Sequence, residues 1–166
     1  MIHIRPAKTD DAESILAIYA PIVETTAISF ELVPPTVKEM AERIRAYMAS
    51  HAYLVAEKDD AVLGYAYGTA YRPRAAYATT CEVTVYVGEK ARGQGIGKRL
   101  YAKLLPELAK QGYRTAIAGI ALPNDASTAL HESVGFENAG VLREVGHKFD
   151  RWHDLGLWTL SLKDFA

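Results

Sequence analysis

Glycines and cationic residues are concentrated in one short segment near the middle of the chain. Arg92-Gly93-Gln94-Gly95-Ile96-Gly97 is followed by Lys98 and Arg99, and it separates a β-prone run from a helical pattern. A helix that starts here directs its unpaired amides and the positive end of its dipole at one spot, which suits a phosphate group. Glycines allow close approach of the backbone, while cations in the first turn disfavour the helix by itself. The segment therefore predicts an anion-binding turn.

Glycine-rich turns of other kinds also bind phosphates. A dinucleotide-binding fold uses Gly-x-Gly-x-x-Gly, whereas the glycines here stand at positions 93, 95 and 97, late in the chain. A P-loop needs a hydroxyl residue where this chain has Arg99 and a glycine where it has Arg92. A turn with a purely structural role does not account for the glycines and cations together. The spacing thus excludes the first two sites and leaves a different phosphate ligand.

The run from residue 79 to residue 87 before the turn is a strong strand candidate, because its residues alternate between two faces. The polar face consists of Thr80, Glu82, Thr84 and Tyr86, and the apolar face of Cys81, Val83, Val85 and Val87. We expect the apolar face to enter the core. Cys81 points away from Glu82 and is interpreted as a core residue.

The pattern Arg-x-x-Gly-x-Gly after a Val-x-Val strand resembles the acetyl-CoA signature of the GNAT superfamily of N-acetyltransferases. The order of elements along the whole chain matches as well. In that family the strand before the turn splays from its neighbour, and its backbone pairs with the pantetheine arm. The resemblance implies this role for Val85, Tyr86 and Val87, and it implies pyrophosphate binding by the amides from Gly93 to Lys98. Acetyl-CoA is the co-substrate that it implies.

Five further segments resemble the phosphinothricin and methionine sulfoximine N-acetyltransferases, which acetylate the α-amine of small amino-acid analogues. These segments are YRPRAAY at 71–77, EVTVYV at 82–87, LPND at 122–125, LHE at 130–132 and WHD at 152–154. They occur in register over half the chain, so we expect direct acetyl transfer to the amine of such an analogue. A protein or peptide N-acetyltransferase and a non-catalytic acyl-CoA sensor are the alternatives.

Acetylation of an amine requires a base that takes the ammonium proton, and the departing thiolate benefits from a proton donor. Glu82 is the candidate base, because partial burial on the polar face of its strand would raise its pKa. A structural ion pair with an arginine is the alternative for this carboxylate. A backbone amide near Val85 is the candidate oxyanion donor.

Asn124, Ser127 and His131 are spaced so that they share one stripe of a helix, which can face the cofactor. Asn124 is also a favoured helix N-cap. His131 stands where many superfamily members carry a tyrosine that protonates the thiolate. We therefore expect His131 to act as an acid, in a base relay, or as a hydrogen-bonded helix histidine. Ser133 lies off the stripe and is a further candidate for contact with the far end of the cofactor.

Two arginines flank a proline just after the third expected strand. A guanidinium group can grip a carboxylate through two parallel hydrogen bonds, so the resemblance implies a clamp on the substrate, although exposed loop arginines are usually solvated. The candidate substrate residues of this segment are Arg72, Arg74, Ala75, Ala76 and Tyr77. Phe30 could line the same pocket, but an aromatic residue near a helix start is more often part of a core.

The composition of the 166-residue chain, 49% hydrophobic, allows a sizeable core, so residues 1–166 are expected to form a single N-acetyltransferase domain. A net charge of -1 argues against nucleic acid or a membrane as partner and favours a small-molecule amine. One cysteine and five histidines without ligand spacing predict no disulfide and no metal. The N-terminus lacks a secretory pattern, which predicts a cytoplasmic protein. The resemblance to the family further implies that the protein forms a homodimer.

Hydrophobic periodicity predicts the element order β-α-α-β-β-β-α-β-α-β-β. Strands are expected at residues 2–5, 53–56, 62–67, 79–87, 115–122, 136–145 and 152–162. The fold class is therefore α/β (α+β), GNAT-like, with a mixed, mostly antiparallel sheet of about seven strands and helices on both faces.

Overall fold

A computed structural model of the protein describes residues 1–165. The elements in chain order are β1 (His3–Pro6), α1 (Ala12–Thr25), α2 (Val37–Met48), β2 (Tyr53–Lys58), β3 (Ala61–Ala70), β4 (Thr80–Val87), α3 (Ile96–Lys110), β5 (Thr115–Leu122), α4 (Asp125–Ser133), β6 (Glu137–Lys148) and β7 (Arg151–Ser161). The predicted order of strands and helices is confirmed. None of the helices among these residues is long and apolar enough to span a membrane.

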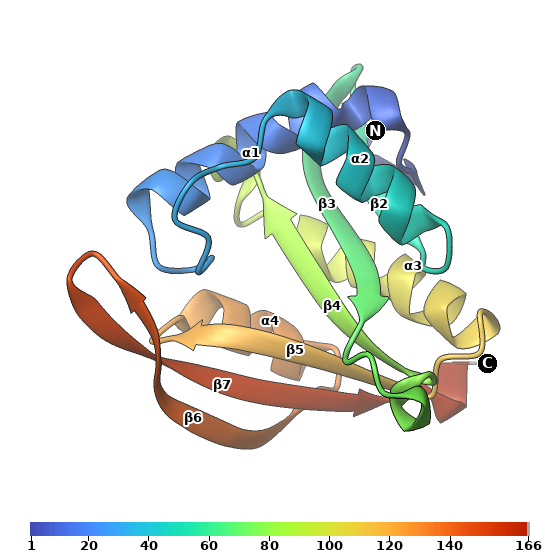
Figure 1. The fold of residues 1–166 in the computed structure, drawn as a ribbon. Helices are drawn as coiled ribbons and strands as arrows, with labels where there is room; N and C mark the ends of the chain where they lie inside the picture. Colours follow the sequence, from blue (N-terminus) through green and yellow to red (C-terminus); the bar gives the residue numbers. More distant parts are fainter. Residues whose placement is uncertain (166) are drawn as a thin grey trace.

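All seven strands form one sheet in the order β1-β2-β3-β4-β5-β7-β6. Every neighbouring pair is antiparallel except β4 and β5, which run parallel. These two strands pair only at Thr80–Glu82 against Thr115–Ile117. Beyond Glu82 they diverge, so the sheet opens into a wedge between its two halves (Figure 1). This splay leaves one edge of β4 without a partner strand.

Helices cover both faces of the sheet, as predicted. On one face α3 packs on a core that includes Leu100, Leu104, Leu108, Cys81, Ala116 and Trp158. On the other face α1 and α2 cover the first four strands through Ile15, Val23, Ile44, Tyr53 and Tyr65. The hairpin of β6 and β7 projects beyond these layers toward the C-terminal end of α1 (Figure 1).

Two tight hairpin turns shape the sheet. Asp59 and Asp60 between β2 and β3 have φ values of 50° and 62°, and Phe149 and Asp150 between β6 and β7 have 55° and 54°. Positive φ at two consecutive central residues is the geometry of a type I′ turn, whose twist matches that of the flanking strands. Because the turn consists only of Phe149 and Asp150, β6 continues to Lys148, three residues beyond the end predicted at residue 145.

The outer edge of β1 is covered by cationic side chains from α3. Arg99 donates to the carbonyl of Ile2 at 2.8 Å, and Lys103 donates to the carbonyl of Ile4 at 2.9 Å. Pro6, at the end of the same strand, has no N–H to offer. Arg99 is therefore directed at the sheet edge and does not add its charge to the anion-binding turn, which corrects the expectation from the sequence.

Candidate active site

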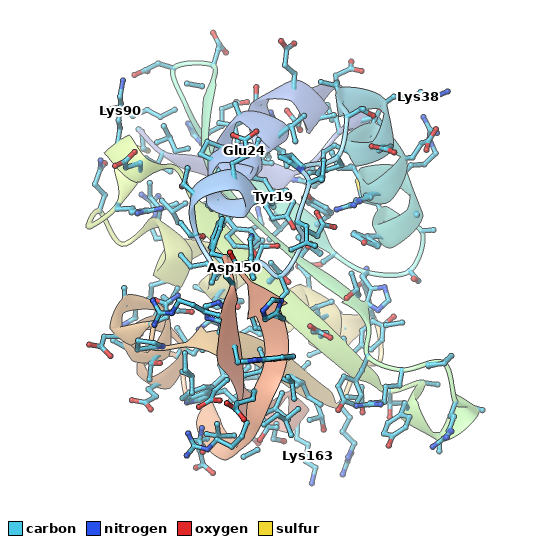
Figure 2. All side chains as sticks on the ribbon, turned by 60° about the vertical axis from the view of Figure 1, so that its left-hand side comes forward. Tyr19, Glu24, Lys38, Lys90, Asp150 and Lys163 are labelled. Carbon is cyan, nitrogen blue, oxygen red and sulfur yellow. The ribbon has the colours of Figure 1, made fainter. Side chains whose placement is uncertain are left out.

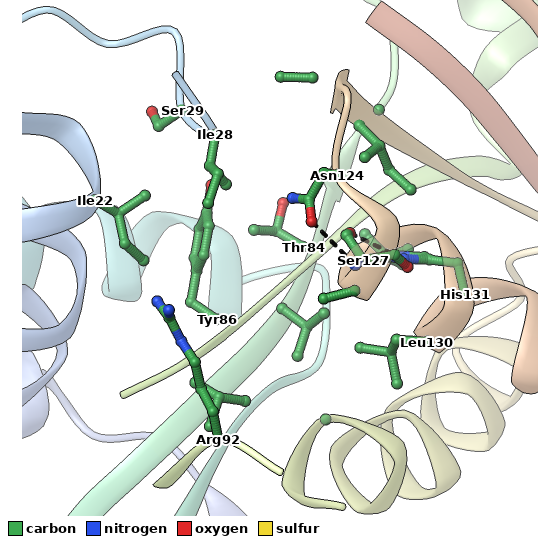
Figure 3. A pocket seen from close by; sticks show the side chains of 18 of the residues that line it. Ile22, Ile28, Ser29, Thr84, Tyr86, Arg92, Asn124, Ser127, Leu130 and His131 are labelled. Atoms are coloured by element: carbon green, nitrogen blue, oxygen red, sulfur yellow. Dashed lines mark hydrogen bonds between the residues drawn. The ribbon is translucent and has the colours of Figure 1, made fainter. Parts of the chain in front are cut away.

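A cavity of about 590 Å³ occupies the wedge between β4 and β5. Its walls come from β4, the turn before α3, β5, α4 and the loop after α1, and Figure 3 shows the side chains that face it. The predicted site residues that line it are Phe30, Glu82, Val85, Tyr86, Val87, Arg92, Gly93, Gly95, Ile96, Gly97, Lys98, Asn124, Ser127 and His131. The splay thus brings together most of the residues chosen from the sequence.

The turn before α3 is shaped by glycines with left-handed backbone conformation. Gly93 and Gly95 have φ values of 75° and 71°, and Gly95 is the N-cap of α3. The first intrahelical hydrogen bond runs from Arg99 N–H to Gly95 O, so the amides of residues 96–98 have no partner within the helix. These free amides at the positive end of the helix fit a phosphate group.

Gly97 and Gln94 of the turn make contacts within the protein that the sequence did not indicate. A Cβ on Gly97 would lie 2.8 Å from Cδ2 of Leu130, so this glycine permits close packing of α3 on α4. Gln94 is exposed and does not line the cavity, and its Nε2 lies 3.5 Å from the carbonyl of Lys90. Gly97 thus serves the packing of α3 on α4, and its amide is also among those that face the cavity.

The open edge of β4 offers backbone groups at alternate residues. Gly88 N–H bonds to Leu63 O across the β3–β4 ladder, and in an antiparallel pair every second residue makes such bonds. The backbones of Thr84 and Tyr86 therefore face β3, whereas those of Val85 and Val87, beyond the last pair with β5, face the wedge. This register fits Val85 and Val87 as partners of a pantetheine arm. Tyr86 contributes its side chain to the cavity instead of its backbone.

Glu82 lies at the narrow end of the wedge, where β4 and β5 last pair. The side chain is half-buried, and burial raises the pKa of its carboxyl, while the positive charge of Arg72 lowers it. Among residues 1–165, no ion pair within 4 Å includes Glu82. The structural ion pair that was the alternative is thus not formed, and the carboxylate is suited to accept a proton.

His131 is held in the cavity wall by hydrogen bonds to both of its ring nitrogens. Its Nδ1 donates to the carbonyl of Ser127 at 2.7 Å, so Nε2 accepts from the hydroxyl of Tyr101 at 2.8 Å. The ring is 4% exposed, and burial lowers its pKa, so it is neutral near pH 7. This geometry favours the hydrogen-bonded helix histidine among the three hypotheses. Asn124 caps α4 as expected, with Oδ1 accepting from Ser127 N–H at 3.1 Å.

The loop expected to bind the substrate lies outside the cavity. The residues concerned are Arg72, Arg74, Ala75, Ala76 and Tyr77, all exposed on the connection from β3 to β4. The guanidinium of Arg72 stacks over the ring of Tyr71 at 5.1 Å from its centroid. Ser133 is also exposed, and its hydroxyl donates to Leu130 O. Within the described chain these residues do not line this cavity, and their roles in binding substrate and cofactor stay predictions.

Several cavity residues carry no signal in the sequence. These are Ile22, Ile28, Ser29, Gly119, Ala121 and Leu155. Ile22 continues the apolar stripe of α1 like any core residue, and Ile28 and Ser29 lie in the loop after it without a motif. The others belong to strands that alternate like any half-buried strand. No group of three or more potential metal ligands gathers anywhere in the described part of the chain.

Comparison of the chain with known proteins identifies its family. The model of the Acetyltransferase (GNAT) domain matches residues 4–157. A phosphinothricin N-acetyltransferase of Alcaligenes faecalis is 46% identical over 96% of this chain and 82% of its own length. The L-methionine sulfoximine/L-methionine sulfone acetyltransferase of Pseudomonas aeruginosa is 38% identical over 96% of this chain and 94% of its own.

A solved structure shows the same fold with a ligand. The crystal structure of a GNAT superfamily phosphinothricin acetyltransferase from Sinorhizobium meliloti, in complex with AcCoA, superposes with a TM-score of 0.92 at 36% identity, and the match covers 96% of this chain and 88% of that one. The splayed sheet, the anion-binding turn and these relatives lead to one conclusion. The chain belongs to the GNAT family of acetyltransferases.

Proposed function

We propose that the protein transfers the acetyl group of acetyl-CoA directly to the α-amine of a small amino-acid analogue such as phosphinothricin, methionine sulfoximine or methionine sulfone. The observation that carries this proposal is the wedge itself, which has free helix amides at its open end and a half-buried carboxylate at its narrow end. The relatives named above support this substrate class. In this proposal residues 1–166 act as one N-acetyltransferase domain.

Acetyl-CoA would be held mainly by backbone groups. The amides of residues 96–98, together with Arg92 and Lys98, provide the positive potential that the pyrophosphate requires. The free N–H and C=O groups of Val85 and Val87 are placed to pair with the amides of the pantetheine arm. This arrangement points the thioester toward Glu82.

The chemistry requires few groups from the protein. An α-amine arrives as an ammonium ion, and Glu82 takes its proton, directly or through a water molecule, so that the nitrogen lone pair can attack the thioester carbonyl. A backbone N–H on the open edge of β4, near Val85, stabilises the negative charge that develops on the carbonyl oxygen. The C–S bond then breaks, the CoA thiolate leaves, and the nitrogen gives its second proton to the thiolate or to water as the amide forms. No covalent acyl-enzyme is formed.

Turnover of acetyl-CoA, read as free thiol, tests this function against a panel of amines. Methionine sulfoximine, methionine sulfone and phosphinothricin should release thiol at higher kcat/KM than arylamines or peptides. Preference for peptides would support a protein N-acetyltransferase instead. Thermal stabilisation by acetyl-CoA without thiol release from any amine would indicate a sensor.

We also propose that the protein is a cytoplasmic homodimer that detoxifies such analogues. Exposed apolar side chains on the β6–β7 hairpin support an association surface, since large exposed apolar patches mark interaction sites. They are Leu142, Val145, Phe149 and Trp152, which are 43%, 53%, 53% and 65% exposed. Light scattering on the purified protein should give twice the mass of the chain, and a monomer mass would contradict the dimer.

A further inference from the structure

A buried lysine joins two segments that are far apart in the sequence. Lys148, the last residue of β6, is only 4% exposed. Its Nζ donates to Val23 O at 2.6 Å and to Ser29 O at 2.8 Å. Burial of an ammonium group is costly unless it is hydrogen-bonded. The two carbonyls therefore form a specific binding site for the ammonium group of Lys148.

Both acceptors belong to the end of α1 and the loop that follows it. Val23 lies in the last turn of α1, where carbonyls lack intrahelical partners and the helix dipole favours a cation. Ser29 is buried in the loop, and its hydroxyl bonds to the hydroxyl of Tyr19 at 2.8 Å. Figure 2 shows the hairpin tip at Asp150 next to the part of α1 that carries Tyr19. Lys148 thus connects the helical layer to the β6–β7 hairpin.

Phe30 provides a second tie between the same two segments. Its ring lies against Gly146 of β6 so closely that a Cβ there would come within 2.6 Å of the ring. The ring also lies 6.2 Å from that of His153, whose Nε2 donates to the carbonyl of Lys148 at 2.9 Å. The position of Phe30 is therefore set by the hairpin on one side and by the loop backbone on the other.

The loop fastened in this way forms one wall of the cavity. Ile28, Ser29 and Phe30 all line it, and Figure 3 shows Ile28 and Ser29 at the end opposite Arg92. The anion-binding turn belongs to other elements, and the hydrogen bonds of the Lys148 ammonium group in the described chain go to Val23 and Ser29. A change in the loop should therefore affect the acceptor and leave acetyl-CoA binding intact.

We propose that Lys148 is a positioning residue for acceptor specificity: it fastens residues 28–30 to the β6–β7 hairpin and so sets the place of the Phe30 ring at the acceptor end of the cavity. This inference rests on the proposed function, because it takes a small amine as the molecule that enters there. Lys148 itself does not touch the reacting atoms.

The test compares Lys148→Met, which keeps the length of the side chain but removes the donors, with Lys38→Met, a change of the same type at an exposed position of α2. Lys148→Met should raise KM for methionine sulfoximine roughly tenfold, since small misplacements of positioning groups weaken productive binding. The KM for acetyl-CoA and kcat at saturation should stay within about twofold. Lys148→Arg, which retains donors, should restore much of the affinity, and Lys38→Met should behave as the wild type.

Gly146→Ala gives a second test that leaves Lys148 in place. The added methyl group meets the ring of Phe30, so it should raise the acceptor KM selectively as well. If Lys148→Met does not fold, Gly146→Ala alone tests whether the position of the Phe30 ring sets acceptor binding. Equal changes in both KM values, or no change in the acceptor KM of either variant, would overturn the inference while leaving the function intact. A wild-type enzyme without turnover on any small amine would overturn the proposed function, and this inference with it.

Discussion

The two ends of the cavity are built in different ways. The end at the turn before α3 consists of backbone: left-handed glycines, free helix amides and the unpaired edge of β4. The end opposite Arg92 is lined by side chains of residues 28–30, a loop that contacts the distant β6–β7 hairpin. A backbone site is insensitive to most side-chain changes, whereas a side-chain site can be altered one residue at a time. The first end thus suits an invariant ligand and the second a variable one.

The largest expected effect is at the acceptor end. Glu82→Gln removes the proton acceptor, so kcat should fall by roughly 10² to 10⁴ while the KM for acetyl-CoA changes little. Steady-state kinetics with both substrates varied would measure this, with Glu42→Gln on the exposed side of α2 as the control. A full-rate Glu82→Gln enzyme would remove Glu82 from the mechanism.

At the cofactor end, amide hydrogen exchange should show an alternating pattern. The amides of Val85 and Val87 face the wedge, so saturating acetyl-CoA should slow their exchange, by up to about 100-fold at 100 times Kd. Thr84 and Tyr86 already bond to β3 and should change much less. Uniform protection along β4 would contradict the register deduced for the pantetheine arm.

A matched pair of glycine variants separates backbone strain from ligand binding. Gly95→Ala places a Cβ at φ 71° and Gly112→Ala at φ 95°, and both sites are free of steric contact. Each should cost about 1–2 kcal/mol of stability, because the left-handed conformation disfavours a Cβ. Only Gly95→Ala should also raise the Kd for acetyl-CoA, roughly tenfold for a further cost of about 1.4 kcal/mol when the ligand meets the altered turn. Equal affinity in the two variants would argue against the turn as the pyrophosphate site.

The smallest effect concerns pH. Glu82 must be ionised to accept a proton, and burial raises its pKa, so kcat/KM should increase with pH through a value above that of an ordinary glutamate. The positive charge of Arg72 lowers this pKa, so Arg72→Ala should move the acidic limb of the profile to higher pH. Arg74→Ala on the same loop is the control. A shift to lower pH would show that Arg72 acts in another way.

The same contrast explains what the sequence could predict. Strand order, helix positions and the anion-binding turn depend on contiguous residues, whose periodicity and glycine content are visible in the chain itself. The contact of Gly97 with Leu130 was not predicted, because only the packing of α3 on α4 brings these two residues close. Lys148 carries no signal at all, because a lysine at a strand end is normally exposed. Contacts between distant segments, such as the one from Lys148 to Ser29, cannot be deduced from local patterns.

The covered edge of β1 has a consequence for the behaviour of the protein at high concentration. An open sheet ends in a row of free N–H and C=O groups, onto which another chain can add a strand and start a polymer. In β1 the outward carbonyls of Ile2 and Ile4 are occupied by Arg99 and Lys103, and Pro6 removes a donor. The cations at the start of α3 thereby protect the molecule from edge-to-edge aggregation, and Arg99→Ala combined with Lys103→Ala should make it more prone to form fibrils.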